Sequence, residues 1–176
     1  MKQKIWAKTL LSTYNCLEPI SDAIDKLVIS QGVNSCCNHL STMENAEKII
    51  SLIQRKKMMI NLKVIIENVI ASIDTKSARI LVMKYFDHVK PEMCFKLLEM
   101  SRRTFFRKID RAVEEFAIRL KNFGYTSEKL EQLLFKESWI KEYYNHFAKQ
   151  KESNICTDEE FEFNSSYTNS LNKCKA

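Results

Sequence analysis

Apolar residues recur along most of the chain at steps of three and four, which is the spacing of one face of an α-helix. This pattern begins at residues 4–30, where Pro19 stands among the apolar positions. Because proline has no amide proton and disfavours a helical residue before it, we expect two short helices, one on either side of Pro19. The polar stretch that follows, residues 30–41, is predicted to be a loop.

A second apolar pattern covers about 30 residues without glycine or proline. It starts after Ser41 and Glu44, which have the S-x-x-E spacing of a capping box, and it predicts a helix from Thr42 to Ile73. The apolar face of this helix is too wide for an isolated surface helix. It either packs inside the domain, which is the simpler interpretation, or pairs with a second copy of the chain to form a homodimer.

Three helices are predicted between residues 74 and 124. The first covers residues 76–87, and the second covers residues 91–98 and begins with a proline, which is favoured in a first turn. A turn of three residues then leads to Ser101, a good N-cap for a long basic helix. Gly124 is expected to end this third helix.

The remaining residues divide into a helical part and a polar tail. Residues 125–150 keep the helical spacing and predict one helix or a pair of helices. Beyond about Gln150 the chain is rich in asparagine, serine and acidic residues, so residues 151–176 are predicted to be disordered. The predicted organisation is thus an N-terminal packing or dimerisation region, residues 1–73, then the three helices of residues 74–124, a helical extension and the tail.

Composition supports the same fold class. Two glycines and two prolines among 176 residues argue against a β-rich protein, because hairpins depend on glycine-containing turns. We therefore expect an all-α protein, a helical bundle. Its net charge of +6 is unevenly distributed, since residues 76–121 carry 12 Lys and Arg against 6 Asp and Glu. A concentrated basic region of this kind suggests a polyanionic partner.

The helices predicted over residues 76–120 follow the order of a helix-turn-helix. In the basic helix the apolar residues fall on one face, which we expect to be buried: Phe105, Ile109, Ala112, Val113 and Phe116. The cations and one threonine fall largely on the remaining face, which we expect to contact DNA: Arg102, Arg103, Thr104, Arg107, Lys108 and Arg111. Phe106 lies beside the buried face, either as a rim residue or as an apolar contact to a thymine methyl group.

The two halves of the outward face are expected to have different roles. The N-terminal turn of such a helix enters the major groove of double-stranded DNA, where Arg102, Arg103 or Thr104 would reach base edges. Arginine can bind guanine there through two hydrogen bonds. The three cations further along the helix are better placed for phosphates, which set affinity and register without reading sequence.

The segment ARILVMKYFDHVKPEMCFKLLEMSRRTFFRKIDRAVEEFAIRL, residues 78–120, resembles the region 4 helix-turn-helix of bacterial sigma-70-type factors. It is also similar to the small phage-derived transcriptional regulators of the ArpU and RinA kind. The resemblance covers about residues 74–121 and is strongest in LVMKYFDH and SRRTFFRKIDRA. It implies a sigma-region-4-like reader of DNA, with RNA polymerase as a further partner. The DNA contacts that it implies are Arg102, Arg103, Thr104 and Arg107.

Three residues depart from the usual motif. Phe95 and Glu99 stand where alanine and glycine are common, because the two helices approach closely and the turn residue needs a positive φ. Phe105 stands in place of a usual valine. These changes predict a helix pair that is spread apart, and a motif kept only as a packing unit is the alternative to a DNA reader.

Other candidate sites are weak. The sequence CCNH, residues 36–39, offers two thiols and an imidazole, but a structural zinc site needs about four ligands and no second pair is within sequence reach. His88 and His146 are lone histidines in the sequence. Since no phosphate-binding glycine loop and no hydrolase or metalloprotease motif is present, we expect neither an enzyme nor a cofactor.

The remaining expectations concern location and function. No run of about 18 apolar residues occurs, so no membrane span is expected. The six cysteines form no CxxC pair and are most simply reduced thiols of a cytoplasmic protein. The sequence thus predicts a sequence-specific, double-stranded DNA-binding transcriptional regulator. The alternative is a helical protein-interaction adaptor that binds RNA polymerase or another regulator without reading DNA.

Overall fold

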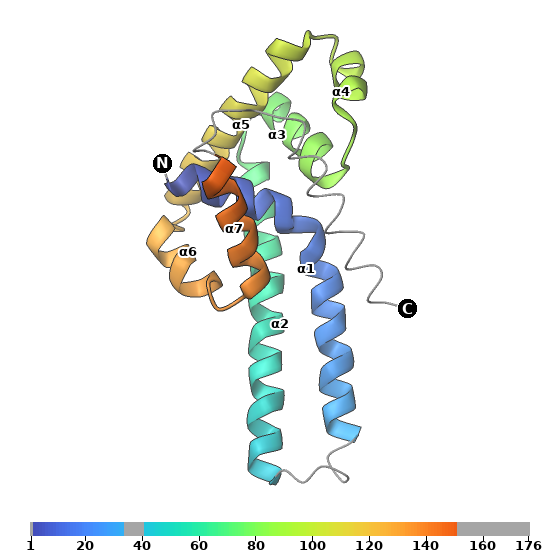
Figure 1. The fold of residues 1–176 in the computed structure, drawn as a ribbon, viewed down its shortest axis with the longest axis vertical. Coiled ribbons are helices and arrows are strands. Elements are labelled where there is room, and N and C mark those ends of the chain that lie inside the picture. The colour runs from blue at the N-terminus through green and yellow to red at the C-terminus, as the bar shows by residue number, and fades with distance from the viewer. Residues whose placement is uncertain (1, 34–40, 151–176) are drawn as a thin grey trace. The chain divides into compact units, whose positions relative to one another are not determined.

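The computed structural model describes residues 2–33 and 41–150, and every regular element within these ranges is a helix (Figure 1). The predicted all-α fold class is therefore confirmed for the described part of the chain. The elements in order are α1 (Lys2–Val33), α2 (Thr42–Ala71), α3 (Thr75–Leu81), a π-helical turn η2 (Val82–Phe86), α4 (Pro91–Leu97), α5 (Arg102–Asn122), α6 (Ser127–Leu134) and α7 (Ser138–Gln150).

The chain divides into two compact units. Unit 1 contains residues 1–13 and 68–176, and unit 2 contains Tyr14–Glu67. Unit 1 thus holds the start of α1, the end of α2 and all of the later helices, including the predicted helix-turn-helix. Unit 2 holds the longer parts of α1 and α2. The predicted tail, residues 151–176, lies outside the described residues.

The two helical segments of unit 2 are joined by ion pairs on both sides of Pro19. Lys63 Nζ lies 2.8 Å from Glu18 Oε2, and Lys56 Nζ lies 2.6 Å from Asp25 Oδ2. The prediction of two short helices is wrong, because α1 continues through Pro19. An interior proline costs a helix about 3 kcal/mol. Contacts with α2 before and after Pro19 oppose this cost, and the local sequence does not reveal them.

At the other end of unit 2, α2 begins with the predicted capping box. The Ser41 amide donates to Glu44 Oε2 at 2.9 Å, and the Glu44 amide donates to Ser41 Oγ at 3.3 Å. The predicted loop over residues 30–41 is partly wrong, since α1 extends to Val33. The CCNH sequence of residues 36–39 lies outside the described residues.

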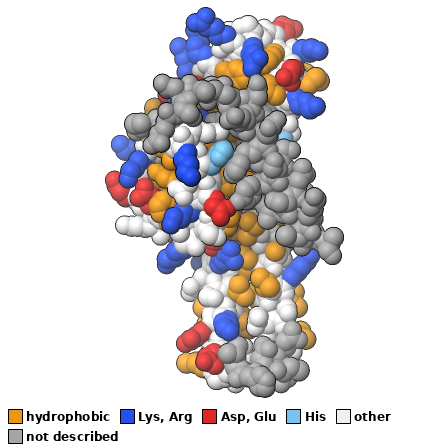
Figure 2. Space-filling model, in the orientation of Figure 1, with side chains coloured by type: hydrophobic (Ala, Val, Ile, Leu, Met, Phe, Trp, Pro, Cys, Tyr) orange, Lys and Arg blue, Asp and Glu red, His pale blue; other side chains and the backbone are white. Residues whose placement is uncertain are grey.

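Unit 2 has one buried and one exposed apolar face. Leu17 and Ile24 of α1 are buried, as are Met59 and Leu62 of α2. The long helix therefore packs within the chain through one face. Hydrophobic side chains also lie on the surface of unit 2 (Figure 2). Its exposed large apolar residues are Leu27, Ile29, Val33, Met43, Ile50, Ile53, Ile60 and Val64.

The core of unit 1 is built around α5. Helices α3 and α4 both pack against α5. Every residue that the apolar pattern assigned to the inner face of α5 is buried, and so are Ala117 and Leu120 one turn further along. Leu81 at the end of α3, Tyr85 in η2 and Tyr143 in α7 are also withdrawn from water.

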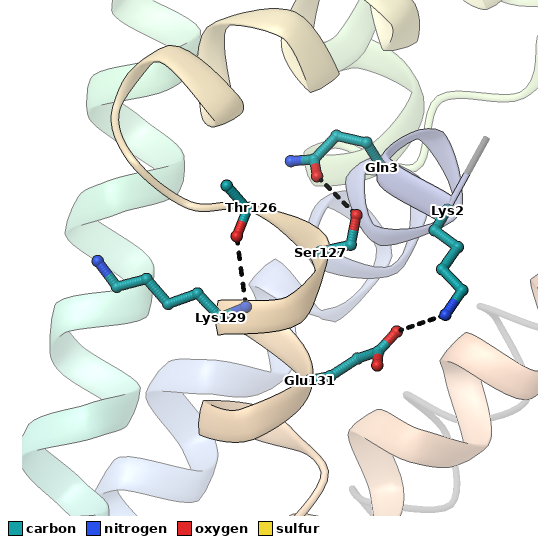
Figure 3. A network of polar contacts seen from close by, with 6 residues as sticks. All are labelled: Lys2, Gln3, Thr126, Ser127, Lys129 and Glu131. Atoms are coloured by element: carbon teal, nitrogen blue, oxygen red, sulfur yellow. Dashed lines mark hydrogen bonds and ion pairs between the residues drawn. The ribbon is translucent and has the colours of Figure 1, made fainter.

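The start of α1 closes this core from another side. Trp6 is fully buried, and its ring centroid lies 5.4 Å from that of Phe135 and 4.7 Å from that of Tyr144. Beside it, Gln3 links α1 to the start of α6 (Figure 3). Its amide nitrogen donates to the carbonyl of Tyr125 at 2.8 Å, and its amide oxygen accepts from Ser127 Oγ at 3.0 Å.

Capping groups set the ends of the helices of unit 1, and those at Ser101 and Gly124 were predicted from the sequence. Ser101 Oγ accepts from the Thr104 amide at the start of α5, and the Asp74 carboxylate, which was not predicted as a cap, accepts from the Lys76 and Ser77 amides of α3. Gly124 has φ of 82° and ends α5. The amide of Gly124 donates to the Lys121 carbonyl, and the next amide donates to the Leu120 carbonyl, which is the Schellman arrangement.

Two predicted helices of unit 1 have different boundaries in the structure. The helix predicted over residues 76–87 starts as α3 and changes to the wider turn η2 at Val82. The region 125–150 is a pair of helices, α6 and α7, and Leu133 of α6 is exposed although its spacing suggested an apolar contact.

We expect Phe105→Ala to lower the free energy of unfolding by about 3–5 kcal/mol, because it leaves a cavity where α4 and α5 meet. Phe106→Ala is the matched control, since that ring is half-buried and should cost less than half as much. Urea denaturation followed by circular dichroism measures both changes. Equal losses for the two variants would show that Phe105 is not the anchor of α5.

Candidate nucleic-acid interface

The turn between α4 and α5 has the backbone conformation that usually calls for glycine. Glu99 has φ of 48°. Its amide donates to the Lys96 carbonyl at 3.3 Å, and the Met100 amide donates to the Phe95 carbonyl at 3.1 Å, so α4 also ends in a Schellman arrangement. A residue other than glycine in this region carries a strain of about 1–3 kcal/mol. The sharp turn of a helix-turn-helix is therefore kept despite the glutamate.

Three phenylalanines fill the space between α4 and α5. The ring centroid of Phe95 lies 5.1 Å from that of Phe105 and 6.2 Å from that of Phe106, and all the rings meet edge to face. This geometry is favourable for aromatic pairs. The unusual residue Phe95 is thus matched by the unusual residue Phe105, and the pair holds the short helix on the basic one.

The basic residues of α5 lie on its exposed face. Arg103, Arg107, Lys108 and Arg111 are exposed, and within the described part of the chain they make no ion pair or hydrogen bond. Arg103, Arg107 and Arg111 follow one another at steps of four, which forms a row about 12 Å long on the helix surface. Lys and Arg side chains gather at this end of unit 1 (Figure 2).

The acidic residues of α5 are engaged elsewhere in unit 1. Lys4 Nζ lies 3.0 Å from Asp110 Oδ2 and 2.8 Å from Glu114 Oε1. Burial opposes the charge of Lys4, but the hydrogen bonds to Glu114 and Asp110 outweigh it and raise the pKa of Lys4. The Glu115 carboxylate accepts from the backbone amide of Asp74 at 3.4 Å. Within the described part of the chain, none of these three carboxylates forms an ion pair with the row of arginines.

The three predicted base readers in the first turn of α5 have different surroundings. Arg103 is exposed, whereas Thr104 is half-buried and its Oγ1 shares a hydrogen bond of 2.9 Å with Ser101 Oγ. Arg102 lies over the ring of Phe106, with 5.8 Å between its Cζ and the ring centroid, which is within the range of a cation–π contact. Phe106 thus supports a cation, which is more specific than the rim role that the sequence suggested.

The sequence did not reveal the contact of Lys4 with this surface, and it named Phe106 without its contact to Arg102. Lys4 lies more than 100 positions away from Asp110 and Glu114, and no local pattern connects them. Phe106 was assigned to the edge of the buried face, and its contact with Arg102 follows from the i, i+4 spacing of the two residues on a helix. No sequence pattern links Lys4 to the two carboxylates, whereas the spacing of Arg102 and Phe106 can be read from the sequence.

No competing site emerges in the described residues. They contain no group of three or more His, Cys, Asp or Glu side chains that could hold a metal ion. Burial lowers the pKa of His88, although Asp87 acts in the opposite direction. Cys16 and Cys94 are free and buried. Among the helices described, none is long and apolar enough to cross a lipid bilayer.

Comparison with known proteins gives one match. The family described as "Protein of unknown function (DUF1492)" matches residues 37–117. This span includes α2, α3, α4 and most of α5, so the helix-turn-helix falls within it. No curated protein and no solved structure matches the chain.

We expect Lys4→Met to lower the free energy of unfolding by about 0.5–1 kcal/mol at pH 7, the scale of an exposed ion pair. Because the pKa of Lys4 is raised in the folded chain, this contribution is complete below its ordinary value of 10.5 and is lost as the pH rises through the raised value. The difference between the two proteins should therefore narrow above pH 10.5.

Urea denaturation at pH 7 and above pH 10.5 measures this difference, with Lys136→Met as the control because Lys136 is exposed in the same unit. A destabilisation by Lys4→Met that stays constant across this range would contradict an ionic role for Lys4.

Proposed function

We propose that the chain is a sequence-specific, double-stranded DNA-binding transcriptional regulator that uses α4 and α5 as a sigma-region-4-like helix-turn-helix. Its action is binding without the making or breaking of covalent bonds. The resemblance of residues 78–120 to sigma region 4 and to ArpU- and RinA-type regulators gives the proposal its starting point.

The observation that carries the proposal is the row of arginines on α5. A helix surface with Arg103, Arg107 and Arg111 close together has strong self-repulsion, and a folded protein usually relieves it with nearby carboxylates. Here the carboxylates of the same helix are held by Lys4 and by the start of α3. A phosphate backbone would supply the missing negative charge.

The dimensions of the surface also support duplex DNA. An α-helix with its side chains is about 10–12 Å across, and the major groove is about 12 Å wide and admits it. Arg102 and Arg103 in the first turn would then reach base edges. Arg107, Lys108 and Arg111 would contact phosphates on the groove walls. Thr104 is the weakest of the predicted contacts, because its hydroxyl already takes part in the cap of α5.

A second candidate function is a helical adaptor that binds RNA polymerase or another regulator through the same unit. Met93 and Leu97 of α4 favour it, since they lie one turn apart and expose 49% and 57% of their surface. An apolar pair beside a basic helix would suit a protein partner with an acidic rim. Salt-dependent binding to random duplex DNA supports the first function, and its absence supports the second.

The sharpest test is a set of three alanine variants on α5. Arg103→Ala should weaken binding to the preferred duplex by about 1–3 kcal/mol and relax the preference at one base pair. Lys108→Ala should weaken preferred and random duplexes alike and reduce the salt slope by about one. Arg119→Ala, an exposed cation in the last turn of the same helix, should leave both unchanged.

The preferred duplex is first obtained by selecting bound sequences from a random pool, and affinities are then measured by fluorescence anisotropy at several salt concentrations. If Arg103→Ala and Lys108→Ala behave like the Arg119→Ala control, the assignment of α5 as a DNA reader fails.

A further inference from the structure

Helix α2 carries an exposed and mostly apolar stripe that lies outside its buried face. Within unit 2 the stripe consists of Met43, Ala46, Ile50, Ile53, Lys57, Ile60, Val64 and Glu67, all of which are exposed. We call these residues the outer stripe. They follow one another at alternating steps of three and four, which is the a and d spacing of a coiled coil.

The exposure of this stripe is unusual for a monomer. Ile50, Ile53, Ile60 and Val64 leave 53%, 51%, 46% and 47% of their surface open. These four β-branched residues lie along one side of the helix, with Lys57 between Ile53 and Ile60, and large exposed apolar patches mark interaction sites. The buried face of α2, with Met59 and Leu62, is already occupied within unit 2. A second helix is therefore needed to cover the outer stripe.

We propose that the outer stripe pairs with the outer stripe of a second copy of the chain, in an antiparallel arrangement centred between Ile60 and Val64. A two-fold symmetric interface must be complementary to itself. The outer stripe meets this requirement because it contains one cation, Lys57, and one anion, Glu67, on either side of its apolar centre.

The charges select the register. When two such helices run in opposite directions, an a position of one faces a d position of the other, so the possible registers differ by whole heptads. In one register Lys57 faces Glu67 of the second copy, and by symmetry Glu67 faces the second Lys57. In the same register Ile60 faces Val64 on each side of the two-fold axis, and Ile53 faces Ala71.

Neither neighbouring register forms the two ion pairs. One of them sets Lys57 opposite Ile60 and Glu67 opposite Ile50. The other sets Glu67 opposite Val64 and Lys57 opposite position 74, which lies beyond the end of α2 at Ala71. A charge that loses water without gaining a partner is costly, so both registers are disfavoured. The preferred register exchanges these contacts for two ion pairs.

Reversal of the charges tests both the dimer and its register. In the proposed register Lys57→Glu and Glu67→Lys each replace two attractions with two repulsions, and each should raise the dimer Kd about tenfold. The double variant Lys57→Glu with Glu67→Lys should return the Kd to within about threefold of the original. Sedimentation velocity of the full chain at roughly micromolar concentrations, without DNA, measures these values.

A matched control separates the effect of the charge at Glu67 from the effect of its hydrogen bond with Tyr14 inside unit 2. Tyr14 Oη donates to Glu67 Oε1 at 2.6 Å, and Glu67→Lys breaks this hydrogen bond as well. Tyr14→Phe breaks it without a change of charge and should leave the dimer unchanged. Circular dichroism melting curves of all the variants establish that each of them is folded.

The apolar residues give an independent test of the register. Ile60 and Ile50 are both exposed isoleucines of the outer stripe. The residue opposite Ile50 would be position 74 of the second copy, which lies beyond the end of α2 at Ala71. Ile60→Ser should therefore raise the dimer Kd about tenfold or more, whereas Ile50→Ser should change it by less than about twofold.

Three outcomes would overturn the proposal. A chain that remains monomeric up to about 100 µM has its stripe covered by another part of the chain or by another protein. Single charge reversals with no effect would mean that Lys57 faces Lys57 of the second copy and Glu67 faces Glu67, as in a parallel pair. A larger effect of Ile50→Ser than of Ile60→Ser would select a different register. The proposal is independent of DNA binding, because every measurement is made without DNA.

Discussion

One face of α5 is withdrawn from water by α3 and α4, and the positions of the other groups in unit 1 follow from this burial. Phe105 and Phe116 are fully buried on that face. Burial of these two side chains contributes about 3–6 kcal/mol together, which is enough to offset a strain of about 1–3 kcal/mol at Glu99 in the turn before α5. The helix therefore has one allowed rotation about its axis. With the apolar face fixed inward, the arginines of the same helix must face outward.

The charge of this surface depends on contacts that are distant in sequence. A row of arginines with its own acidic neighbours would be close to neutral, since Asp110 and Glu114 lie on the same side of α5 as Arg107. Lys4 binds both carboxylates, and its positive charge offsets part of their negative charge. The start of α1 thus contributes to the proposed DNA-binding surface without lying in the helix-turn-helix. The cation–π contact of Arg102 with Phe106, four residues along the same helix, is a local contribution to this surface.

The packing of unit 2 depends on how much apolar surface its two helices can bury against each other. Two helices alone can bury only one face each, so the apolar residues of α2 exceed what α1 can cover. The excess is the outer stripe, and its charges make it complementary to itself in one antiparallel register. Pro19 illustrates the contacts that do form, because Leu17 and Ile24 on either side of it are buried and ion pairs join α1 to α2 before and after it. Local preference opposes the continuous helix there, and tertiary contacts stabilise it.

The sequence by itself determined the helical class, the positions of the caps at Ser41, Ser101 and Gly124, and the inner face of α5, because these depend on residues within one or two turns of each other. It also identified the exposed cations of α5. Only the tertiary structure decided the continuity of α1 through Pro19, the contact of Phe95 with Phe105, and the ion pairs of Lys4 with Asp110 and Glu114. Each of these joins residues whose distance in space is unrelated to any period in the sequence.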